Sequence, residues 1–191
     1  MLYAEVNGQC TPIGSNNETK FTAAAVTTPT IYLNTDYPAP CSGTVSRWRY
    51  CFYRPVTHGA EDKYRLTLAV YRRMVTQYKI VESSQCTFTV DFPTQSNGFT
   101  CQYLDLSMSR NGQFDIEAGD IVGACIFNPS QGDRERMDIV SEANGYSLMR
   151  LPSNTFCGYN SIPRTISSSQ LLIVNSRLLH LSATITSRCS I

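Results

Sequence analysis

The sequence predicts an all-β fold, a disulfide-stapled antiparallel β-sandwich of jelly-roll-like form with about ten strands. Apolar and polar residues alternate along most of the chain with the period of two typical of half-buried strands, and helical periodicity is hard to find. Asn-Gly and Gly-Asp pairs separate these runs at near-even spacing, as tight turns do. Eight cysteines are scattered over the chain without the close pairs that zinc and redox motifs need.

The strands are predicted from the alternating runs in chain order. The run 45–53 places Trp48, Tyr50 and Phe52 on one face, with arginines between them on the other face. The run 63–74 repeats this pattern with aliphatic residues inward. The remaining strands are predicted at 76–82, 86–92, 99–108, 113–117, 121–127, 136–141, 145–151, 171–175 and 178–186.

Three segments depart from regular alternation. Within 99–108 the inward face switches between Tyr103 and Leu104, which predicts a β-bulge. The segments 11–30 and 152–170 are rich in Thr, Ser, Asn and Pro, a composition that predicts an extended arm and a long loop.

The cysteines indicate an oxidising compartment. An even number of isolated thiols, several of them inside predicted strands, is typical of disulfides in secreted proteins. The spacing does not reveal which thiols pair, but those in strands are placed to join sheet to sheet. Those near the two ends could close the domain or link it to a neighbour. The predicted disulfide cysteines are Cys10, Cys41, Cys51, Cys86, Cys101, Cys125, Cys157 and Cys189.

Composition and charge exclude several classes of protein. With 42% hydrophobic and 16% charged residues, the chain is too apolar for disorder and poor in charge for a cytosolic protein. Its net charge of +1 gives no field to recruit nucleic acid or an anionic membrane, and no stretch is apolar enough to span a bilayer. Residues 1–15 lack a signal-peptide pattern, so a secretion signal would lie outside this segment. We expect an extended N-terminal arm at 1–30 and a single sandwich domain at 31–191.

Motifs for catalysis are missing from the sequence. The histidines, His58 and His180, are interpreted as surface or loop residues, and no nucleophile elbow or glycine-rich phosphate loop accompanies them. We therefore expect no enzymatic activity and no catalytic residue. Asn17 begins the one N-glycosylation acceptor motif of the chain.

The acidic residues Asp115, Glu117 and Asp120 form the best candidate metal site. The first two share one face of a short predicted strand, and Asp120 follows the next turn, so three carboxylates could converge on a calcium ion. The alternative is that Asp120 bonds the amides of the turn while the other two face solvent. Calcium is the only cofactor that the sequence suggests.

Arginine and tyrosine residues on outward faces suggest a ligand-binding strip. They belong to the strands predicted at 45–53 and 63–74. If these strands are neighbours, the side chains form a basic, aromatic surface suited to sulfated glycans or to an acidic protein surface. The candidate residues are Arg47, Arg49, Tyr53, Arg65, Tyr71 and Arg73.

A family resemblance is carried by four segments, SRWRYCFY (46–53), YRLTLAVYRR (64–73), FTCQYLDL (99–106) and FDIEAGDIVGACI (114–126). Their order resembles that of a β-sandwich module found in large secreted and cell-surface proteins of sponges and related invertebrates. The resemblance implies an extracellular, non-enzymatic role in adhesion, matrix or recognition, often as one module among several. It implies no catalytic residues.

Two functions remain open at this point. The first is an extracellular module for adhesion, matrix or recognition of a glycan or protein. The second is a structural subunit that assembles into a fibre or matrix by exchanging its N-terminal arm with other copies of itself. The uncharged, β-compatible run Phe21–Val26 could add a strand to the open edge of a neighbouring copy, or it could pack on its own domain.

Overall fold

The computed structural model contains two antiparallel β-sheets, which confirms the predicted all-β, disulfide-stapled sandwich. The structure describes Cys10 and residues 12–15, 31–54, 64–90, 98–108, 112–127, 140–151 and 162–187. The five-stranded sheet contains β1 (Ile13–Gly14), β3 (Gly43–Arg54), β7 (Gly98–Asp105), β8 (Phe114–Ile116) and β13 (Leu181–Ser187). The eight-stranded sheet contains β2 (Ile31–Asn34), β4 (Tyr64–Arg73), β5 (Gln77–Ile80), β6 (Cys86–Val90), β9 (Ile121–Phe127), β10 (Val140–Leu151), β11 (Thr165–Ser167) and β12 (Leu172–Leu179).

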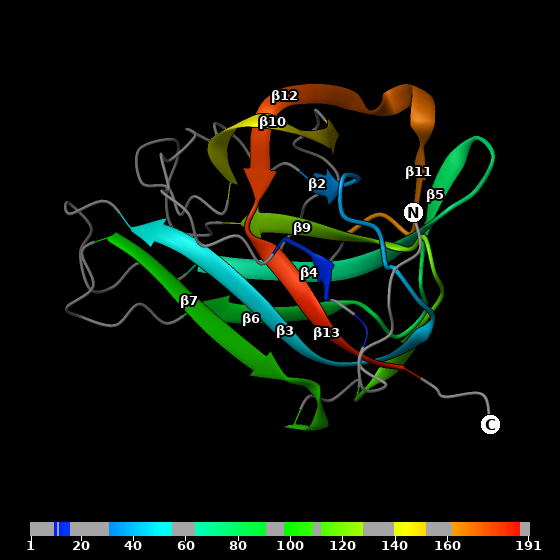
Figure 1. Ribbon diagram of the computed structural model, residues 1–191, viewed down its shortest axis with the longest axis vertical. Helices are drawn as coiled ribbons and strands as arrows, with labels where there is room; N and C mark the ends of the chain where they lie inside the picture. Colours follow the sequence, from blue (N-terminus) through cyan, green and yellow to red (C-terminus); the bar gives the residue numbers. More distant parts are fainter. Residues whose placement is uncertain are drawn as a thin grey trace.

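The two sheets lie one in front of the other (Figure 1). In the five-stranded sheet the order is β1-β13-β3-β7, and β8 also pairs with β3. In the eight-stranded sheet the order is β11-β5-β4-β9-β2-β10-β12, and β6 also pairs with β4. The chain crosses from the second sheet to the first at His180, which lies between β12 and β13.

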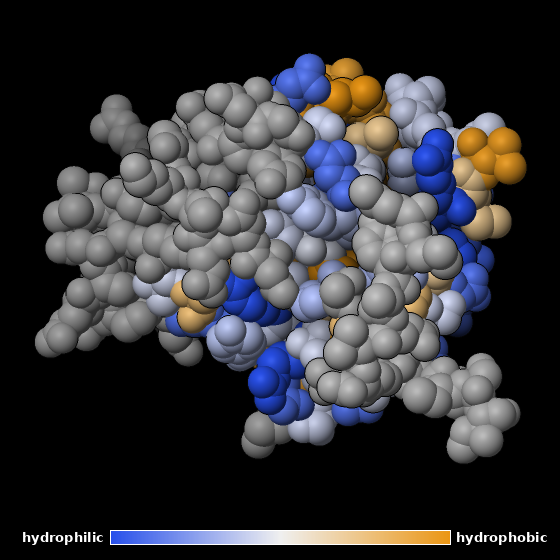
Figure 2. All heavy atoms as spheres, viewed as in Figure 1, coloured by the Kyte–Doolittle hydropathy of each residue, from blue (hydrophilic) through white to orange (hydrophobic). Residues whose placement is uncertain are grey.

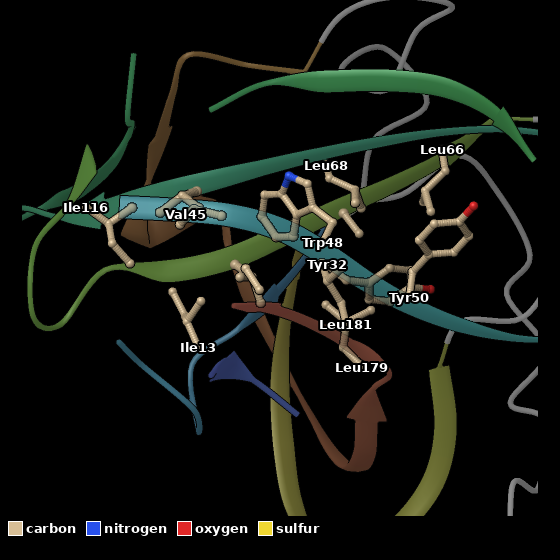
Figure 3. Packing of buried hydrophobic residues seen from close by; sticks show 14 of the residues in the cluster. Ile13, Tyr32, Val45, Trp48, Tyr50, Leu66, Leu68, Ile116, Leu179 and Leu181 are labelled. Atoms are coloured by element: carbon tan, nitrogen blue, oxygen red, sulfur yellow. The ribbon is translucent and has the colours of Figure 1, made fainter. Parts of the chain in front are cut away.

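The main core fills the space between the sheets. Trp48, Tyr50 and Phe52 are at most 5% exposed, which confirms the inward face predicted for 45–53. Figure 3 shows Trp48 and Tyr50 projecting from β3 toward Leu66 and Leu68 of β4. Alternation places one face of each strand in this core, so the sequence pattern alone locates it.

A second core lies on the other face of the eight-stranded sheet. Tyr71 was predicted to face outward, but it is fully buried there with Ala69 and Leu33. Its hydroxyl donates a hydrogen bond to the carbonyl oxygen of Pro163 at 2.9 Å. The prediction was wrong because β4 is a central strand, and residues 162–167 contribute Ile162 and Ile166 to this second core.

The register of β7 differs from the predicted one. β7 pairs with β3 without a shift from Gly98 to Asp105, so no bulge separates Tyr103 from Leu104. Leu104 lies opposite Trp48, on the inward side, and Tyr103 lies on the outward side. The inward side of β7 is continuous, because Thr100 and Gln102 lie opposite the inward residues Phe52 and Tyr50. Polar residues at these inward positions produced the change of pattern that suggested a bulge.

Several elements are more extensive than the sequence indicated. The two strands predicted at 136–141 and 145–151 are one strand, β10, with an irregularity between Glu142 and Ser147. The predicted loop 152–170 contains β11 and the 3-10 helix Ser168–Gln170. β2 was not predicted as a strand because all four of its residues are buried, which leaves no polar alternation to detect.

Part of the N-terminal arm packs on its own domain. β1 pairs antiparallel with β13, and Ile13 is fully buried in the main core. Gly14 has φ +85°, and its amide donates to the carbonyl of Tyr37 at 3.1 Å. The run Phe21–Val26, on which arm exchange was predicted, lies outside the described residues.

The disulfides differ from the predicted arrangement. Cys10 is bonded to Cys41, which ties the arm to the segment before β3. Cys51 is bonded to Cys101, its direct neighbour in the register of β3 and β7, so this bridge joins two strands of one sheet and does not join sheet to sheet. Cys125 is also disulfide-bonded, with its partner outside the described residues.

Cys86 carries a free thiol, contrary to the prediction that all eight cysteines form disulfides. It lies on β6 opposite Leu68 and is half-buried, and burial raises the pKa of its thiol. Cys157 and Cys189 lie outside the described residues. The disulfides of the described part indicate an oxidising compartment. Within that part, none of the helices is long and apolar enough to cross a membrane.

Candidate functional site

The predicted arginine and tyrosine strip is not assembled. β3 and β4 belong to different sheets, so Arg47 and Arg49 are separated from Arg65 and Arg73 by the main core. Tyr71 is buried in the second core. The side chain of Tyr53 lies outside the described residues. The strip depended on the two strands being neighbours in one sheet, and this condition is not met.

Arg47 and Arg49 have different surroundings on the outer face of β3. Arg47 is half exposed and lies 3.6 Å from the carboxylate of Asp105 and 5.9 Å from the ring centre of Tyr103. Hydrogen bonds from Ser107 lower the pKa of Asp105, and Arg47 adds to this effect. Arg49 is only 8% exposed, and its guanidinium approaches the sulfur of Cys101 at 3.2 Å. Arg49 is therefore poorly placed to contact a ligand.

The three acidic residues predicted to bind calcium do not form a metal site. Arg72 of β4 lies between two of them. Its guanidinium bonds both carboxylate oxygens of Asp120, at 2.9 and 3.0 Å, and an oxygen of Glu117 at 2.7 Å. Asp115 instead accepts a hydrogen bond from Thr44 at 2.8 Å. No group of His, Cys, Asp or Glu residues in the described ranges is arranged to hold a metal ion.

We call Arg72, Glu117 and Asp120 the Arg72 centre. Asp120 is 1% exposed and accepts a further hydrogen bond from the amide of Glu117 at 2.8 Å, which is the turn contact that the sequence offered as the alternative to calcium. The hydrogen bond with Asp120, aided by the charges of both carboxylates, raises the pKa of Arg72. The centre joins β4 to the turn between β8 and β9 and fixes that turn in place.

A second fixed turn, between β5 and β6, lies close to the Arg72 centre. Ser84 is fully buried, and its hydroxyl accepts from the amide of Val70 at 3.0 Å and donates to its carbonyl at 3.3 Å. The amide of Val81 also donates to the carbonyl of Val70, at 2.8 Å. Ser83 has φ 65°, a left-handed conformation that closes the turn. These bonds anchor Val81 and Ser84 to Val70 of β4 at the end of the sandwich.

Three neighbouring clefts lie at this end of the molecule, and the Arg72 centre lines two of them. The first, of about 510 Å³, lies between 79–83 and the β8 region. The second, of about 420 Å³, shares Arg72 and Glu117 with the first and extends to Tyr78. The third, of about 370 Å³, shares 79–83 with the first and extends to Arg164. The clefts therefore adjoin one another, and we call them the end clefts.

Lys79 occupies the centre of this end of the molecule. In the sheet register Lys79 lies opposite Arg72 on one side and opposite Thr165 on the other, so the three side chains share a face. The two carboxylates of the Arg72 centre neutralise Arg72, whereas Lys79 and Arg164 are exposed and have no ion-pair partner among the described residues. Figure 2 shows hydrophilic residues along this side of the molecule, below the apolar tip of the β4–β5 turn.

The sequence did not point to Lys79, Arg72 or Arg164 as site residues. Arg72 falls at an inward position of β4 and Lys79 lies on a short strand, so only the pairing of β4, β5 and β11 brings them together. His180, predicted to be at the surface, is 1% exposed because the chain passes between the two sheets there. Asn17 and His58 lie outside the described residues.

Comparisons with known proteins give no relative. No protein-family model matches the chain, and no curated protein or solved structure matches it either.

Proposed function

We propose that this chain is an extracellular, non-enzymatic recognition module that binds an anionic glycan in the end clefts. The observation that carries the proposal is the pair of cations Lys79 and Arg164, which have no ion-pair partner among the described residues and line one cleft. Backbone hydrogen bonds from Val81 to Val70 and from Ile80 to Arg164 hold the wall of this cleft. A rigid wall lowers the entropy cost of binding, because few groups must be ordered when the ligand arrives.

The charges of the third cleft favour an anionic ligand. Lys79 and Arg164 contribute two positive charges, and Glu82 is the one acidic side chain in its lining. Ile80 and Val81 also line this cleft, and part of each aliphatic side chain is exposed there. Sulfate or carboxylate groups on a sugar could pair with the cations while the apolar faces of the ring contact the aliphatic surface.

The compartment and the resemblance agree with this role. Disulfides persist outside the cell, where glycans of this kind are displayed. The four segments that resemble modules of secreted and cell-surface proteins point in the same direction.

Arm exchange is the weaker alternative for residues 10–15. Cys10 is bonded to Cys41 of the same chain, and β1 completes the edge of the five-stranded sheet beside β13 of the same chain. Exchange of this part of the arm would require that disulfide to form between copies.

A glycan array tests the proposal. Wild-type protein should bind sulfated or carboxylated glycans more strongly than neutral ones, with the same pattern in calcium and in chelator. The double substitution Lys79→Ala and Arg164→Ala should lower binding by at least about tenfold, since two charge-assisted contacts are lost.

Arg47→Ala is the matched control for the glycan array. It removes an exposed cation from the other sheet without touching the end clefts. Binding that survives the double substitution but is lost with Arg47→Ala would move the site to the outer face of β3. Failure of the wild-type protein to prefer anionic glycans would refute the proposed ligand class.

A further inference from the structure

β12 forms an open edge of the eight-stranded sheet. It pairs with β10 and with no other strand among the described residues. An edge strand presents a row of backbone amides and carbonyls that can bond another strand. Proteins commonly protect such edges with charged residues, proline or a covering segment. In β12 the sequence LIVNSRLL contains no proline and one charged residue, Arg177.

The beginning of β12 exposes apolar side chains on both faces of the sheet. Leu172 is 47% exposed and Ile173 is 66% exposed. Because neighbouring residues of a strand point to opposite faces, these two side chains lie on different sides of the sheet. A partner that docked on one face would cover only one of them, whereas a strand added beside β12 would cover both.

We propose that β12 pairs antiparallel with β12 of a second copy, so that the two eight-stranded sheets become continuous in a two-fold symmetric dimer. In such a dimer the same surface serves both partners. The uncharged segment 172–175 would then lie against itself, apolar against apolar, on both faces of the joined sheet.

The charge distribution suits a second copy. In an antiparallel pair, Ile173 can lie opposite Leu172, Ile173 or Val174 of the other copy. In these three registers position 177 lies opposite position 168, 169 or 170 of that copy, respectively. Those positions are the exposed, uncharged residues Ser168–Gln170. Arg177 therefore meets no like charge in any of these registers. The net charge of +1 also leaves little repulsion between two copies.

Sedimentation velocity over a range of concentrations tests the proposal. Wild-type protein should dimerise reversibly, and Ile173→Lys should weaken the dimer by at least about tenfold, because the substitution places a charge on each side of the two-fold axis. Tyr103→Lys is the matched control: Tyr103 is 62% exposed on β7, which belongs to the five-stranded sheet and not to the sheet that β12 edges. It should leave the dimer intact.

Hydrogen exchange gives a second measurement on the unmodified protein. Amides in 172–175 should become more protected as the wild-type protein dimerises, because strand pairing engages the open edge. Wild-type protein that stays monomeric at every concentration would overturn the proposal. So would a dimer that Ile173→Lys leaves unchanged, or one that forms without added protection of these amides.

Discussion

At the scale of single residues, the Arg72 centre replaces the calcium site that the sequence suggested. Both sites use acidic residues around one turn, and the sequence alone does not distinguish a bound ion from a bound guanidinium. The decisive residue is Arg72, which comes from another strand and supplies the positive charge itself. Asp120 is almost fully buried and depends on that charge.

Arg72→Ala should therefore destabilise the fold by about 2 kcal/mol, since it leaves the Asp120 carboxylate buried without its charged partner. Urea unfolding can be followed by the fluorescence of Trp48, the one tryptophan of the chain. Arg47→Ala, which removes an exposed ion pair at 3.6 Å, should change stability very little. Equal losses for the two variants would mean that Arg72 is no better anchored than a surface arginine.

At the scale of elements, alternation located the strands that have a polar face, whereas of two strands buried on both faces β9 was predicted at 121–127 and β2 was missed. β3 and the inward face of β4 follow the alternation of the sequence, because each has a solvent side or a polar side to contrast with the core. β2 is buried throughout and gives no such contrast. The outward positions of β4 were misassigned for the same reason, since Tyr71 lies under residues 162–167.

The short strand β1 offers a test at this scale. Gly14 has φ +85°, and an added Cβ would collide with the backbone carbonyl of Leu181 in β13. Gly14→Ala should therefore detach β1 and cost more than about 2 kcal/mol, the sum of backbone strain and loss of pairing. Thermal or urea unfolding measures the loss.

Gly112→Ala is the control for this substitution. Gly112 also has a positive φ, of 66°, but an added Cβ would meet nothing within 4 Å. It should cost only the backbone strain, about 1 kcal/mol. A Gly14→Ala variant as stable as Gly112→Ala would show that β1 contributes little to the domain.

At the scale of the whole molecule, the arrangement of the sheets decides where a site can form. Periodicity assigns each residue to a face of its own strand, but it does not say which strands share a sheet. Because β3 and β4 lie in different sheets, the predicted arginine and tyrosine strip does not form. The end clefts lie instead where β4, β5 and β11 pair. Disulfides were predictable as a class, whereas the sequence did not distinguish Cys86, which carries a free thiol, from the bonded cysteines.

The most direct test of the account is nuclear magnetic resonance mapping with a heparin-derived oligosaccharide as the anionic probe. The amide signals of residues 79–83 and of Arg164 should shift as the probe is added, and those of Arg47 and Tyr103 on the other sheet should stay in place. Shifts confined to β3 and β7, or no shifts at saturating probe, would contradict binding of an anionic glycan in the end clefts.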